Sequence, residues 1–255
     1  MRRDIAIAIT LCIGCLASAG PASMASAQSA VRYVGCETDV MGGAAHYAAP
    51  VGTPRPINAA TATALHLSFY QALMSPGKLL PGIYAPRDWH CYAYMGDGLG
   101  EVLVSPDALG PQYLGGNLGP GLSLTSISSD SGPGFTFALQ VMSAYFPEHL
   151  GEYLRSAGAL TGNTFSKAQP LPKAWAADSL QRLGDWSVLI TTPAGRAGFG
   201  TQSGWFVAGA LPVQTLIVVD SVDYWIYELR VRLPPQDAAL LPAILQAEPS
   251  ELRGR

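Results

Sequence analysis

The stretch 81–106 constrains the fold more than any other part of the sequence. It reads PGIYAPRDWHCYAYMGDGLGEVLVSP, with two strand-like runs, 84–94 and 101–104, on either side of the glycine-rich segment 96–100. An Asp-Gly pair between two such runs is a strong hairpin signal, because glycine readily adopts the positive φ that a tight turn needs. We therefore expect an antiparallel hairpin here, with Cys91 in its first strand.

The N-terminus has the features of an export signal. Arg2 and Arg3 precede an apolar run over 5–16, and small residues follow up to an A-x-A pattern that ends at Ala27. A signal peptidase cuts after such a pattern, and the apolar run is shorter than the roughly 20 residues that span a bilayer. We expect an exported bacterial protein, periplasmic or secreted, with a signal peptide over 1–27.

A lipoprotein signal is the alternative reading of the same segment. The residues before Cys15 loosely resemble a lipobox, in which case Cys15 would become a lipidated N-terminus. A cysteine three places before the cut is unusual in such a motif, and the A-x-A site competes with it. We therefore expect cleavage after Ala27.

Two cysteines, Cys36 and Cys91, remain once the signal peptide is removed. An even pair in an oxidising compartment predicts a disulfide bond between them. A reactive thiol at Cys91 is the other interpretation. A thiolate needs a helix N-terminus or a nearby cation to lower its pKa, and Cys91 lies in an aromatic strand instead.

The composition excludes several classes of partner. Charged residues make up 13% of the chain, against about 25% in a typical soluble domain. Removing Arg2, Arg3 and Asp4 with the signal peptide changes the net charge from −3 to −4. Without a run of basic residues, nucleic acid is not an expected partner. We expect a monomer without a cofactor and without a transmembrane segment in the mature chain.

Apolar periodicity and turn residues predict the remaining elements. We expect an extended N-terminal arm over 28–56 and a flexible tail over 248–255. Helices are predicted over 58–73, 135–146, 148–159 and 237–246. Strands are predicted over 31–34, 186–192, from 205 onward, over 215–219 and over 224–233, with loops over 113–124 and 161–172.

The strand 224–233 carries the most information about the sheet. Apolar residues alternate there with a set that includes Glu228, Arg230 and Arg232. This alternation is typical of an antiparallel sheet that packs on one face and exposes the other. Because strands and helices do not alternate along the chain, we expect one α+β domain over 57–247, with a mainly antiparallel sheet and two to four packed helices.

The familiar catalytic motifs are all incomplete. An H-x-x-E pattern at His149 and Glu152 lacks the third histidine that a zinc carboxypeptidase needs downstream, and no H-E-x-x-H occurs. No G-x-S-x-G elbow is present. The S-x-x-K pattern at 75–78 contains Pro-Gly, which prevents the helical turn that would aim the lysine at the serine. We therefore expect no metal and no cofactor.

The residues around Cys91 hold the candidate site. The carboxylate of Asp88 could orient His90 as a general base, with Ser129 or Ser131 as a nucleophile. The candidate ligand-binding side chains are those of Arg87, Trp89, Tyr92 and Tyr94. A hydrogen-bonded aromatic packing surface is the simpler interpretation of the same pattern. In the predicted helix 58–73, His66 and Tyr70 lie one turn apart and indicate a surface pair.

Three segments resemble an uncharacterised family of exported proteobacterial proteins. Residues 85–106 are similar to its A-P-R-G-W-x-C-x-x-x-x-G-S-x-G-x-x-L-x-V-x-P stretch, and residues 227–245 and 35–39 are similar to its C- and N-terminal segments. This sequence has Asp88 where the family has glycine, and Gly-Asp at 96–97 where it has Gly-Ser. The resemblance implies export and a shared fold, with no known activity.

These observations favour an exported, non-catalytic binding or envelope-associated protein. Its partner would be an envelope component or a small ligand. The alternative is a hydrolase with an unfamiliar arrangement of residues around His90 and Asp88.

Overall fold

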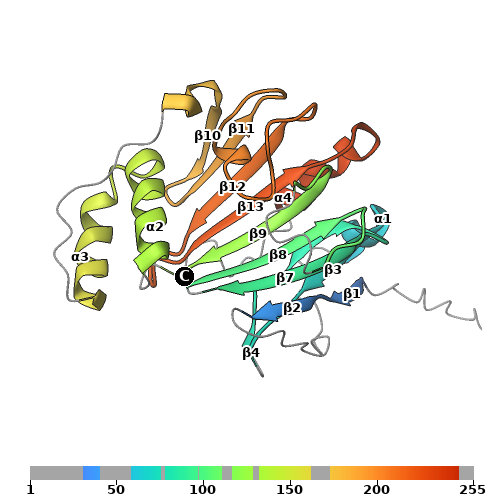
Figure 1. Cartoon of the computed structure of the whole chain (residues 1–255), viewed down its shortest axis with the longest axis horizontal. Helices are drawn as coiled ribbons and strands as arrows, with labels where there is room; N and C mark the ends of the chain where they lie inside the picture. Colours follow the sequence, from blue (N-terminus) through green and yellow to red (C-terminus); the bar gives the residue numbers. More distant parts are fainter. Residues whose placement is uncertain are drawn as a thin grey trace, which may run out of the picture.

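A twisted eight-stranded sheet runs through the molecule (Figure 1). The computed structural model describes residues 31–40, 59–75, 78–96, 98–110, 117–128, 132–161 and 173–246. The strands of this sheet, in spatial order, are β10 (Ser179–Gly184), β11 (Ser187–Thr192), β12 (Val213–Val219), β13 (Ile226–Arg232), β9 (Gly121–Ile127), β8 (Leu99–Ser105), β7 (His90–Gly96) and β2 (Glu37–Val40). All neighbours are antiparallel except β2 and β7, which are parallel.

A smaller sheet packs on one face of the eight-stranded sheet. Its order is β1 (Arg32–Gly35), β3 (Leu67–Gln71) and β6 (Ile83–Pro86). It shares one apolar core with α4 (Leu241–Gln246) and with the inward side chains of the central strands, such as Val104, Leu124 and Leu229. A short helix, α1 (Ala59–Ala64), and the hairpin of β4 (Leu73–Ser75) and β5 (Lys78–Leu79) accompany this layer.

Helices cover the opposite face. In α2 (Gly132–Tyr145), which corresponds to the predicted helix 135–146, Phe135, Leu139 and Met142 form a buried stripe that packs on isoleucines of the sheet. Helix α3 (Leu150–Thr161) lies beside α2 (Figure 1). The described residues also include the 3₁₀ helices η2 (Lys173–Ala177), η3 (Phe199–Thr201) and η4 (Pro235–Leu240). The described chain is thus one α+β domain with mostly antiparallel sheets, and this confirms the predicted fold class.

The predicted hairpin forms, but its first strand is shorter than expected. Gly96 pairs with Leu99, and Gly98 has φ 71° in the tight turn between β7 and β8. The expected strand 84–94 is wrong as one element, because the chain turns at Asp88, which has φ 72°. The turn divides it into β6, in the small sheet, and β7, in the large one. The strand-like run 84–94 therefore contributes one strand to each of the two sheets.

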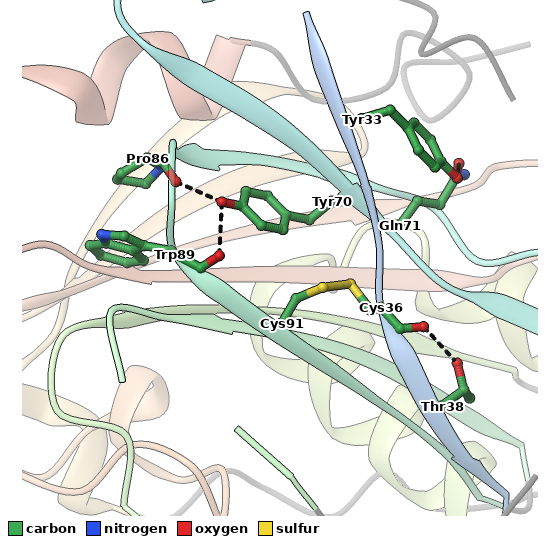
Figure 2. Close-up of a disulfide and its surroundings, with 8 residues drawn as sticks. All are labelled: Tyr33, Cys36, Thr38, Tyr70, Gln71, Pro86, Trp89 and Cys91. Carbon is green, nitrogen blue, oxygen red and sulfur yellow. Dashed lines mark hydrogen bonds between the residues drawn. A yellow bond between two sulfur atoms is a disulfide. The ribbon is translucent and has the colours of Figure 1, made fainter. Parts of the chain in front are cut away.

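The predicted helix 58–73 is also wrong beyond its first turns. Helix α1 ends at Ala64, His66 has φ 54°, and the chain continues as strand β3. Pairing with β1 and β6 outweighs the helical spacing of the apolar residues. Tyr70 is consequently buried and not part of a surface pair. Its hydroxyl donates to the carbonyls of Pro86 (2.8 Å) and Trp89 (3.2 Å; Figure 2).

Two further predictions are wrong, and one strand was not predicted. The expected loop 113–124 contains the start of β9, a central strand whose seven residues are all buried. The strand expected from 205 onward does not form, because residues 202–212 are irregular, and β12 corresponds to the separately predicted strand 215–219. Strand β10 has no counterpart in the sequence analysis, since all its side chains are exposed and show no apolar alternation.

The predicted disulfide bond joins Cys36 to Cys91, with 5.2 Å between the two Cα atoms (Figure 2). Cys36 lies between β1 and β2, and its backbone N–H donates to the carbonyl of Gln71 in β3 (2.9 Å). Because β1 belongs to the small sheet and β2 to the large one, the bond fixes the residue at which the N-terminal segment passes between the layers. Residues 31–40 are the described part of the predicted arm.

Reduction of this bond is expected to lower the free energy of unfolding by about 4 kcal/mol, because it closes a loop with a sequence separation of 55 residues. Urea unfolding with and without dithiothreitol measures the difference. The Cys36→Ser/Cys91→Ser variant is the control and should not respond to the reductant. Equal midpoints for oxidised and reduced wild type would contradict the expectation.

Candidate functional site

The structure does not join the two residues predicted as a catalytic pair. Asp88 and His90 are both exposed, and no hydrogen bond or ion pair links them. The carboxylate of Asp88 accepts a hydrogen bond from Arg32 Nη1 at 2.6 Å instead. His90 begins β7 and pairs through its backbone with Ser105. The two candidate nucleophiles, Ser129 and Ser131, lie outside the described residues.

The four predicted ligand-binding side chains occupy different environments. Trp89 packs against the core between the two sheets, and Tyr94 is half-buried. Arg87 is half-buried, and its Nε has no hydrogen-bond partner. Burial raises the pKa of the Tyr92 hydroxyl to about 12, with a further contribution from the carboxylate of Asp39. Because Tyr92 is buried, these side chains do not form one exposed aromatic surface.

A group of polar side chains that the sequence analysis missed is buried on the sheet face that α2 covers. We call it the buried polar cluster, and none of its side chains is more than 5% exposed. Its members are Glu101, Ser123, Thr125, Thr215, Glu228, Arg230 and Arg232. Strand register places them together, since Glu101 is opposite Thr125, Thr125 is opposite Glu228, and Ser123 and Thr215 are both opposite Arg230.

Glu101 is the best-satisfied acid of the cluster. Thr125 Oγ1 donates to its Oε1 at 2.9 Å, and the indole N–H of Trp205 donates to its Oε2. Burial raises the pKa of this carboxyl to about 7. The hydrogen bonds and the guanidinium of Arg230 oppose that rise, because they favour the ionised form, while the carboxylate of Glu228 adds to it.

Glu228 and Arg230 form a buried ion pair. They lie two residues apart on β13, so both point to the same face, and 2.5 Å separates Arg230 Nη2 from Glu228 Oε2. The guanidinium also lies 5.3 Å from the centre of the Phe199 ring. Burial raises the pKa of Glu228, and Arg230 counters this. Such a pair forms at a high desolvation cost, so each partner depends on the other.

Arg232 holds an irregular segment, residues 193–212, against the sheet; we call this the cover segment. Its Nη2 donates to the carbonyl of Val207 (2.5 Å) and its Nη1 to that of Leu118 (3.2 Å). The guanidinium lies 5.1 Å from the centre of the Phe206 ring. Together with the Trp205–Glu101 hydrogen bond, these contacts attach the cover segment to two buried charged side chains, those of Arg232 and Glu101.

The start of the cover segment is fixed by a third carboxylate. Asp178 accepts hydrogen bonds from the backbone N–H of Phe199 and from Thr192 Oγ1, both at 2.8 Å. A Cβ atom at Gly198 would overlap the Asp178 carboxylate, so a glycine is needed at this position. This brings the Phe199 ring into contact distance of Arg230.

The arrangement favours a structural role for the cluster. A carboxyl with a pKa near neutrality suits general acid–base chemistry. Both oxygens of Glu101, however, already accept hydrogen bonds from side chains of the protein, and the group is buried. Among the described residues no group of histidine, cysteine and acidic side chains is arranged to hold a metal ion. No helix within the described ranges is long and apolar enough to cross a membrane.

The sequence holds a signal for this cluster, because Glu228, Arg230 and Arg232 alternate with apolar residues. The prediction that this polar face is exposed to solvent is wrong, since all three side chains are buried. The aromatic and glycine-rich run 198–206 is the second layer that covers them, and only tertiary structure shows the two together.

Comparison with protein families and curated proteins identified no relative of this chain. No protein-family model matches the chain, and no curated protein is similar to it. The resemblance of residues 85–106 to an exported family therefore stays a prediction.

Glu101→Gln is expected to flatten the pH dependence of stability. Because the pKa of this carboxyl is about 7 in the folded state and 4.5 in the reference state, its contribution is fully present at acidic pH and is lost as the pH rises through about 7. The difference in unfolding free energy between pH 5 and pH 8 should shrink by about 3 kcal/mol. Chemical denaturation at both pH values measures it. The exposed Asp185→Asn variant is the control, and an unchanged difference in Glu101→Gln would refute this assignment.

Arg230→Leu is expected to destabilise the fold by about 3–5 kcal/mol, because it leaves the Glu228 carboxylate buried and unpaired. The double variant Glu228→Leu/Arg230→Leu should recover much of this loss, since it removes both charges. Urea unfolding of wild type, the two single variants Glu228→Leu and Arg230→Leu, and the double variant measures the coupling. Additive losses in the double variant would argue against a functional pairing of the two groups.

Proposed function

We propose that this chain is an exported binding or envelope-associated protein without catalytic activity. The observation that supports this most directly is the Cys36–Cys91 disulfide bond. Disulfide bonds persist in oxidising compartments, such as the bacterial periplasm and the extracellular space, and are rare in the cytosol. The signal-like segment 1–27, with cleavage after Ala27, supplies a route to that location.

Binding accounts for the candidate residues better than catalysis does. Asp88 pairs with Arg32, and no hydrogen bond in the described structure joins it to His90, which supports binding over catalysis. The buried acid Glu101 serves to anchor Trp205. The protein would act as a monomer on an envelope component or a small ligand, with the chain around β7 fixed by the disulfide bond.

Export is tested by expressing the full chain in a bacterial host and determining the mass of the mature protein. The proposal predicts a chain that begins at Gln28, found outside the cytoplasm, in which Cys36 and Cys91 do not react with a thiol reagent. An Ala27→Trp variant should accumulate uncleaved, because a signal peptidase requires a small residue there. A cytoplasmic chain with two free thiols would overturn the proposal, and a lipid on Cys15 would replace it with the lipoprotein alternative.

Catalysis is tested on the mature protein with a panel of ester, amide and glycoside substrates. The proposal predicts no turnover above that of a His90→Ala variant. Turnover that disappears in this variant would instead establish the hydrolase alternative around His90 and Asp88.

A further inference from the structure

Strand β10 is an open edge of the eight-stranded sheet. It pairs with β11 on one side and stands at the end of the strand order (Figure 1). All six of its residues are exposed. No hydrogen bond joins its outer backbone to any other part of the chain that the structure describes. An edge of this kind presents N–H and C=O groups at the spacing that another strand requires.

Two other edge strands, β2 and β6, are less exposed. At the far end of the large sheet, β2 follows the disulfide-bonded Cys36 and buries Thr38. In the small sheet, all four residues of β6 are buried, and α4 packs beside this strand. The exposure of β10 on both faces is therefore a specific property of this strand.

The side chains of β10 do little to prevent pairing. Proteins commonly protect open edges with proline or with several charges. Arg182 is the one charged residue of β10, and an ion pair with Glu148 (2.8 Å) neutralises it. Leu180 and Leu183 are 50% and 49% exposed. The irregular register between Arg182 and Gly184 is the one protective feature, and it affects only the end of the strand.

Charge distinguishes between the possible occupants of this edge. Asp178 and Asp185 directly precede and follow β10. If a second copy paired antiparallel through the same strand, the end of one copy that carries Asp185 would approach the end of the other that carries Asp178. Like charges would then meet at both ends of the pair. A peptide with an apolar centre would instead meet Leu180 and Leu183, and basic residues at its ends would lie near Asp178 and Asp185.

We propose that the outer edge of β10 binds an extended segment of another polypeptide, with apolar residues at its centre and basic residues at its ends. The segment would add to the sheet as a further strand. Backbone hydrogen bonds would supply the main attraction, and contacts with Leu180 and Leu183 would supply selectivity. This inference rests on the proposed binding function, for which it names the class of partner.

The test uses the purified protein and a fluorescein-labelled synthetic peptide of sequence KTVTVTVTK, with binding followed by fluorescence anisotropy. A peptide with proline in place of its central valine has the same charge but lacks a backbone donor. The proposal predicts saturable binding of the first peptide and at least tenfold weaker binding of the second.

The variant Leu180→Asn/Leu183→Asn should bind the first peptide at least fivefold more weakly than wild type. Val222→Asn is the matched control, because Val222 is also exposed but lies in the turn between β12 and β13. Thermal unfolding confirms that the variants are folded. No binding to wild type, or equal binding by the β10 variant, would overturn the proposal and leave the export result unaffected. Sedimentation that shows a dimer lost in the β10 variant would assign the edge to a second copy instead.

Discussion

The charged face of β13 is the constraint on which the arrangement of the layers depends. Glu228, Arg230 and Arg232 project from a central strand into the buried interior, where an isolated charge costs several kcal/mol. The neighbouring layer must therefore supply partners for them. The cover segment provides the backbone carbonyl of Val207 and the aromatic rings of Phe199 and Phe206. The cover segment follows an irregular path because it must place these groups next to the buried charges of β13.

The opposite face of the same strand has a simpler requirement. Leu229 and Val231 meet an apolar core that the small sheet and α4 complete. The small sheet itself depends on β1, which is parallel to β3 and adjoins the disulfide-bonded Cys36. The bond thus fixes β1, which belongs to the sheet that covers one face, and β2, which ends the large sheet. Because both faces of the large sheet are covered and its β2 edge is fixed by the bond, β10 is the part of the sheet best placed to bind a partner.

Local patterns in the sequence predicted the elements whose signals are local. The Asp-Gly turn after β7, the buried stripe of α2 and the Cys36–Cys91 pair could all be inferred from neighbouring residues or from cysteine count. The path through 59–71 could not, because strand pairing with distant β1 and β6 decided it. The buried polar cluster escaped for the same reason: alternation shows that a strand has two faces, but only the tertiary fold shows what covers each.

Strand β10 is an edge of the large sheet whose outer side pairs with no other described segment, and amide hydrogen exchange on the native protein tests this central claim most directly. The account predicts the slowest exchange in β9 and β13, which have a strand on either side. Alternate amides of β10, those that point away from β11, should exchange faster by several orders of magnitude. Uniform protection across β10, equal to that of β13, would show that its outer edge is already paired and would contradict the account.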